Sequence, residues 1–141
     1  MPEIVSPIDG QPAYHFDLLR PEQVSARVEL AGATSRAWRD SSIDERVALC
    51  RNMLSAYARN LDQNAEEITR MMGKPIGQAR GEFEGTMVER VEHLCKIAPE
   101  ALADQVLPEK EGFHRFIRHE PVGIVLDIAA WNYPLAIAVN V

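Results

Sequence analysis

The chain has 141 residues, 46% of them hydrophobic, and a formal net charge of −6 at pH 7. This length suits one ordinary domain, and the hydrophobic content is enough for a packed core and too high for a disordered chain. The acidic balance argues against binding to nucleic acid or to an anionic membrane, because both require a basic face.

Cysteine use and apolar segments bear on the compartment. Cys50 and Cys95 lie in helical patterns and form no CxxC pair, so we expect free thiols in a reducing cytoplasm rather than a disulfide framework. Residues 1–10 show no basic start followed by an apolar run, and a secretory signal is not expected. The apolar stretch 122–141 includes Asp127 and Asn132, which are costly in hydrocarbon, so no membrane span is expected.

The first 20 residues are predicted to form an extended arm, because proline and glycine between positions 6 and 12 are typical of turns. Residues 21–112 are predicted to be helical. Pro21 suits the opening turn of the first helix, and Ser42 with Glu45 forms a capping box at the start of the second. The second helix is expected to bury a stripe, with Cys50 as a small core residue: Ile43, Val47, Cys50, Leu54, Tyr57 and Leu61.

Two more helices are expected in this region. Asp62 is predicted to cap the third, which stops at residues 73–75. The fourth is expected from about Gln78 to Ala98, before Pro99. Its predicted buried face comprises Phe83, Met87, Val91, Leu94 and Ala98, and its predicted solvated face comprises Glu82, Glu84, Glu89 and Glu92. Gly81 and Gly85 indicate either close approach by a neighbouring element or simple tolerance of glycine, and both readings stay open.

After residue 112 the pattern changes from helix to strand. Residues 113–121 are charged and alternate imperfectly, as an edge strand would. Residues 122–130 are nearly all apolar and rich in β-branched side chains, which predicts a strand buried on both faces of a parallel sheet. A turn at 131–133 then leads into a helix that begins at Pro134. Because a parallel strand needs a partner beyond a crossover, we expect the chain to be a fragment.

The turn after the buried strand is the predicted site. In open α/β sheets, ligands bind where strands end and helices begin. The Asn132 amide can donate to an oxygen that becomes negative during reaction, Trp131 can wall a pocket, and the following helix points its free amides toward the same space. On the residues alone, an asparagine in such a turn is more often an ordinary turn or cap residue. The glycine-rich dinucleotide fingerprint is missing here, and no metal-ligand spacing is seen, so no metal is expected.

Three segments resemble the aldehyde dehydrogenase superfamily. Residues 120–135, EPVGIVLDIAAWNYPL, resemble its EPxGxxxxIxPWNxPL stretch. Residues 72–76 and 79–82 resemble its MGKP and A-x-x-E segments, and residues 6–10 resemble its usual opening. The resemblance runs in order over nearly the whole chain. One departure is Ala130, where the family usually has proline before the tryptophan.

The resemblance implies an α/β fold in which N-terminal helices surround the first strand-turn-helix of a Rossmann-like nucleotide-binding domain of the aldehyde dehydrogenase fold, truncated here. Residues 21–112 would be the helical part of the cofactor-binding domain, 113–121 a strand of the oligomerisation sheet, and 122–141 the incomplete start of the nucleotide-binding sheet. The family oxidises an aldehyde to a carboxylic acid with NAD or NADP. A cysteine thiolate attacks the aldehyde, hydride passes to the nicotinamide, and a glutamate helps to hydrolyse the resulting thioester.

The implied site residues follow from the matched positions. Asn132 would be catalytic and stabilise the oxyanion, while Ile128, Ala129, Ala130 and Trp131 would bind the cofactor. The nucleophile and general base would lie beyond residue 141, so the chain alone is expected to be inactive, and its full-length parent is expected to be a homo-oligomer, dimer or tetramer. The alternatives are a non-catalytic helical binding or assembly module, and a semialdehyde-specific or acylating member of the superfamily. The apolar tail 122–141 is expected to promote association when unpaired.

Overall fold

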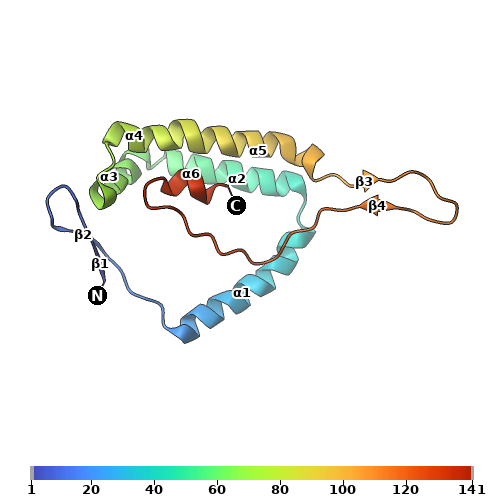
Figure 1. Cartoon of the computed structure of the whole chain (residues 1–141), viewed down its shortest axis with the longest axis horizontal. Coiled ribbons are helices and arrows are strands. Elements are labelled where there is room, and N and C mark those ends of the chain that lie inside the picture. The colour runs from blue at the N-terminus through green and yellow to red at the C-terminus, as the bar shows by residue number, and fades with distance from the viewer. Residues whose placement is uncertain (1, 141) are drawn as a thin grey trace.

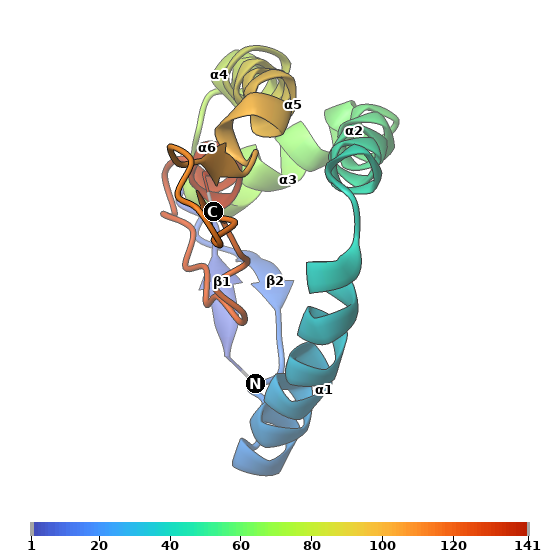
Figure 2. The same ribbon diagram turned by 90° about the vertical axis from the view of Figure 1, so that its right-hand side faces the viewer.

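The computed structural model describes residues 2–140 and is dominated by helices (Figure 1). In chain order its elements are β1 (Glu3–Val5), β2 (Pro12–His15), α1 (Pro21–Asp40), α2 (Ile43–Ala58), α3 (Leu61–Met72), α4 (Ile76–Gly81), the π-helical segment η1 (Glu82–Met87), α5 (Val88–Ala101), β3 (Gln105–Val106), β4 (Phe116–Ile117) and α6 (Pro134–Ala138). Helices α2 to α6 gather into one packed group, and α1 projects away from it (Figure 2).

The helix ends follow the local signals in the sequence. Pro21 is the first residue of α1, and the predicted capping box starts α2, where Glu45 N donates to Ser42 Oγ at 3.2 Å and Ser42 N donates to Glu45 Oε2 at 2.7 Å. These bonds with Ser42 lower the pKa of the Glu45 carboxyl. Gly73 ends α3 with a φ of 77°, a left-handed conformation that favours glycine. The prediction that Asp62 caps α3 is wrong, because Asn60 occupies the cap position.

The predicted fourth helix is longer than expected and contains a π-helical segment. It runs without a break through α4, η1 and α5, from Ile76 to Ala101, and Pro99 lies inside it (Figure 1). In an α-helix, each step of four residues advances about 40° beyond a full turn, so a line of such steps drifts around the helix. The wider turns of η1 offset this drift. We call this continuous helix, residues 76–101, the rod. One line of buried side chains therefore runs along it: Ala79, Phe83, Met87, Val91 and Cys95. Leu94, predicted on this face, is exposed.

The hydrophobic core consists of two adjoining clusters. The larger contains Leu54 of α2 and the rod residues Phe83, Met87, Val91 and Cys95. The smaller contains Ala65, Ile68 and Ala79. Leu135 of α6 packs against both clusters, which places α6 at the junction between α3 and η1. In contrast, α1 contributes no buried residue.

Two sequence expectations within the helices need correction or resolution. Cys50, expected in the core, is exposed. A Cβ added at Gly81 or Gly85 would meet no atom within 4 Å, so no element of the described chain approaches these glycines closely. Simple tolerance of glycine is therefore the reading that the structure supports at both positions.

The segments outside the helices carry little regular sheet. The first residues form a β1–β2 hairpin in place of a plain extended arm, and of residues 113–121 only Phe116–Ile117 is a strand, paired antiparallel with β3. Residues 122–130 are not a strand, so this prediction is wrong for the chain as described. A strand requires a hydrogen-bonded neighbour, and no strand of residues 2–140 lies beside this segment. No helix in the described range is long and apolar enough to cross a membrane.

The unpaired segment leads to a testable expectation about association. Between Val122 and Trp131 its apolar side chains are exposed, and Leu126 is 83% accessible. A contiguous apolar surface next to unpaired backbone groups favours contact with another copy. We expect sedimentation velocity of the 141-residue chain to show association that increases with concentration. Replacing Leu126 and Ile128 with glutamate should restore a monomer, and a monomer in the unchanged chain across the concentration series would refute the expectation.

Candidate functional site

The candidate site is the turn that connects the unpaired segment to α6. Tyr133 N donates to Ala130 O at 3.3 Å and closes the turn, and Ile137 N donates to Tyr133 O at 3.1 Å as α6 begins. Pro134 is the first residue of α6, as the sequence predicts. The Asn132 side chain is exposed at the tip of this turn.

A buried lysine, Lys74, holds the main chain of the turn through a hydrogen bond. Lys74 follows the glycine that ends α3, and its side chain is only 4% accessible. Its Nζ donates to the carbonyl oxygen of Asn132 at 3.2 Å and lies 3.8 Å from the centroid of the Tyr133 ring. The same ammonium group forms an ion pair with Glu82. Lys74 thus connects the end of α3 to the turn and to η1.

Glu82 is the second support, and its side chain is 0% accessible. One carboxylate oxygen, Oε2, bonds to Lys74, and the other, Oε1, accepts from the amides of Leu135 and Ala136 at 2.9 Å each. A carboxylate at this end of a helix also interacts favourably with the helix dipole. Two predictions are therefore corrected. Glu82 does not lie on a solvated face, and two amides expected to be free for a ligand at the start of α6 are already bonded.

The other end of α6 is held by Arg90 of α5. Its Nη1 donates to Ala136 O at 3.0 Å and to Asn140 Oδ1 at 2.8 Å. A cation near the last carbonyls of a helix satisfies acceptors that have no partner within the helix. Because α6 has only five residues, these bonds and the packing of Leu135 must hold it in place.

The remaining predicted site residues lie on the approach to the turn. Ile128 and Ala129 are exposed, Ala130 is half-buried, and Trp131 is 75% accessible. Residues 128–132 therefore form one largely exposed stretch of the chain. Lys74 and Glu82, which support this stretch, were not singled out as site residues from the sequence. A usable signal existed, since Glu82 lies three residues after Ala79 and one before Phe83, on the apolar side of the helix.

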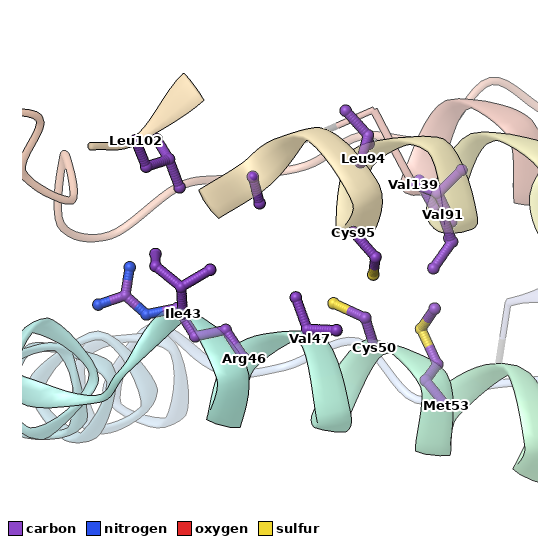
Figure 3. A pocket seen from close by; sticks show the side chains of 12 residues that line it. Ile43, Arg46, Val47, Cys50, Met53, Val91, Leu94, Cys95, Leu102 and Val139 are labelled. Carbon is purple, nitrogen blue, oxygen red and sulfur yellow. The ribbon is translucent and has the colours of Figure 1, made fainter. Parts of the chain in front are cut away.

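A separate apolar pocket of about 270 Å³ lies between α2, α5 and the end of α6 (Figure 3). Asn132 is not among its lining residues. The sulfurs of Cys50 and Cys95 point toward each other across it (Figure 3). Burial and, secondarily, the neighbouring Cys50 raise the pKa of the Cys95 thiol, which disfavours the reactive thiolate. Within residues 2–140, no group of three or more histidine, cysteine or acidic side chains is arranged to hold a metal ion.

Comparison with protein-family models matches residues 2–141 to the aldehyde dehydrogenase family. Two curated relatives are succinate-semialdehyde dehydrogenases. The chain is 29% identical over 131 residues to the NADP+ enzyme of Deinococcus radiodurans, covering 93% of this chain and 27% of the relative. It is 32% identical over 136 residues to the NAD(P)+ enzyme of Escherichia coli K12, covering 93% of this chain and 28% of the relative. The chain thus spans less than a third of these relatives.

Solved structures agree on the fold. The chain matches succinic semialdehyde dehydrogenase from Streptococcus pyogenes, in complex with NADP+, with a TM-score of 0.85 and 22% identity over 97% of this chain and 30% of that one. It matches succinate-semialdehyde dehydrogenase from Burkholderia pseudomallei with a TM-score of 0.84 and 25% identity, over 97% and 28% of the two chains. The predicted aldehyde dehydrogenase fold is confirmed, although the chain includes only part of it. On the match over residues 2–141, this chain belongs to the aldehyde dehydrogenase family.

Proposed function

We propose that this chain supplies the oxyanion-stabilising amide of an NAD(P)-dependent enzyme that oxidises an aldehyde to a carboxylic acid. The observation that carries the proposal is the arrangement at Asn132, whose carbonyl oxygen is bonded to a buried lysine while its side chain stays exposed. A fixed main chain with a free amide side chain suits a donor that must already be in place when negative charge forms. The Asn132 Nδ2 would donate to the substrate oxygen as the carbonyl carbon becomes tetrahedral.

Residues 128–131 fit the part of a cofactor site that needs no charged group. Their side chains are apolar, and Trp131 presents a broad exposed ring that can lie against a flat cofactor ring. We propose that Ile128, Ala129, Ala130 and Trp131 form one wall of the NAD(P) site. When bound, the cofactor supplies the hydride acceptor. Ala130 in place of proline leaves the backbone before Trp131 less restricted, but removes no donor that this role requires.

The substrate, the assembly and the compartment are also proposals. A semialdehyde is the favoured substrate class, because both curated relatives described above are succinate-semialdehyde dehydrogenases. The β3–β4 hairpin projects from the packed helices with Val106 and Ile117 exposed (Figure 1), and this apolar surface supports a homo-oligomer in the full-length protein. The two free thiols, one of them buried in the core, support a reducing cytoplasm.

The proposed role of Asn132 is tested by replacing it with alanine in a full-length aldehyde dehydrogenase that carries this segment. We expect kcat for an aldehyde to fall by about 10²- to 10³-fold, with a smaller change in KM, because the lost bond forms mainly in the transition state. Asn52→Ala, an exposed asparagine on α2, is the matched control and should leave kcat unchanged. The 141-residue chain alone should not reduce NAD or NADP. An Asn132→Ala enzyme with kcat within about threefold of the parent would refute the proposed role.

A further inference from the structure

We propose that the buried Lys74–Glu82 pair is a positioning device for Asn132, which holds the turn in place through main-chain bonds. This inference rests on the proposed function, in which the side chain of Asn132 acts on the substrate. Lys74 and Glu82 would touch neither substrate nor cofactor. They would act only through the peptide backbone on either side of the reacting amide.

The geometry gives the turn two attachment points. Lys74 Nζ bonds to the carbonyl oxygen of Asn132, and Glu82 Oε1 bonds to the amides of Leu135 and Ala136. The ion pair joins the two supports to each other, so that α3, η1 and the turn meet at a single buried charge pair. With the main chain fixed at Asn132 and again at Leu135, the backbone of the intervening residues has little freedom to move.

The bonds of Arg90 and the packing of Leu135 hold α6, which begins after the turn. The residues at the tip of the turn are held differently. Trp131 and Tyr133 are exposed, so the side chains that flank Asn132 are not packed into the core. The bond that closes the turn is long, at 3.3 Å from Tyr133 N to Ala130 O. The contact between Lys74 and the Tyr133 ring, at 3.8 Å from the centroid, adds a third constraint from the same lysine. The order of the turn therefore depends on the buried pair more than on hydrophobic packing.

Stability is not a sufficient reason for such a pair. Removing two charges from water is costly, and replacing a buried ion pair with apolar residues of similar volume is often neutral or stabilising. An apolar pair, however, cannot bond to the carbonyl of Asn132 or to the amides at the start of α6. The charges give the backbone of the turn a directional attachment that packing alone does not provide.

The test separates positioning from stability in the 141-residue chain. The double variant Lys74→Met/Glu82→Leu fills the same space without charge, and the control Arg51→Met/Glu92→Leu makes the same change at the exposed α2–α5 ion pair. Backbone ¹⁵N order parameters are measured at Trp131, Asn132 and Tyr133, with Leu126→Glu/Ile128→Glu present in every variant so that association does not order the turn. The chain with only these two changes serves as the unchanged chain. We expect values near about 0.85 in the unchanged chain and in the control, and below about 0.6 at Asn132 in the double variant. In the double variant, the thermal midpoint and the order parameters of α3 and α5 should stay close to those of the unchanged chain. The single variant Lys74→Arg, which keeps a positive charge, should have a higher order parameter at Asn132 than Lys74→Met.

An order parameter at Asn132 that is the same in the double variant and in the unchanged chain would overturn the proposal. If the double variant does not fold, Lys74→Met/Glu82→Gln, which preserves the size and shape of the Glu82 side chain and still removes the bond to the Asn132 carbonyl, is measured with the same readout and judged by the same outcomes. In a full-length enzyme that carries this segment, the double variant should lower kcat by about 10- to 100-fold and leave KM within about twofold. The order parameters involve no substrate. A rigid turn that depends on the pair, combined with an active Asn132→Ala enzyme, would therefore refute the proposed function and leave the positioning role intact.

Discussion

Replacing Lys74 with methionine should lower the free energy of unfolding of the chain by about 3–5 kcal/mol. The Glu82 side chain is 0% accessible, and in this variant it would keep two amide donors but lose Lys74, the cation with which it pairs. A buried carboxylate without a countercharge is strongly disfavoured, since water cannot solvate it in place of the lost partner. The measurement is urea denaturation at pH 7, followed by far-ultraviolet circular dichroism.

Two further variants show whether the loss arises from the isolated charge. Adding Glu82→Leu to Lys74→Met removes that charge and should recover most of the lost stability. Arg51→Met, which breaks the exposed ion pair between α2 and α5, should leave the stability close to that of the unchanged chain. If Lys74→Met and the double variant are equally unstable, the cause is poor filling of the space and not an unpaired charge.

Features set by neighbouring residues could be predicted from the sequence. The capping box of Ser42 and Glu45, the start of α1 at Pro21 and the left-handed end of α3 at Gly73 each depend on a few consecutive residues. The spacing of Phe83, Met87 and Val91 likewise predicts a buried face, and all three side chains are buried. These signals are local, because a helix end is stabilised mainly by the side chains within one turn of it.

Features that depend on distant partners could not be predicted in the same way. Residues 122–130 have the composition of a buried strand, but composition does not supply the neighbouring strand that pairing requires. Glu82 looks like one of several surface carboxylates until Lys74 and the start of α6, 53 residues later, are brought beside it. The π-helical segment that places Glu82 and Phe83 together on the buried side has no simple sequence signature either.

The candidate site also has one part that the sequence predicts and another that depends on distant residues. The resemblance of residues 120–135 to a known family predicts Asn132 and residues 128–131 as site residues, and the position of Asn132 after a strand-like run gives that prediction a physical reason. Spacing along the chain could not show how the turn is held, because Lys74 and Asn132 are 58 residues apart. The sequence pattern thus leads to the group that is proposed to act on the substrate, whereas the structure shows which side chains contact the turn that carries it.

Replacing Phe83 with alanine should destabilise the chain by about 3–5 kcal/mol, comparable to the loss at Lys74. The Phe83 side chain is 4% accessible in the larger cluster, and its ring stacks on that of Tyr57 with centroids 4.8 Å apart. Alanine would leave a cavity beside the Tyr57 ring, between α2 and η1. Phe113→Ala is the matched control, because Phe113 is 65% accessible and should cost less than about 0.5 kcal/mol. Equal losses for the two variants in urea denaturation would mean that η1 does not pack on α2 as described. A large loss at Phe83 alone would show that the core supports the same segment from which Glu82 reaches the turn.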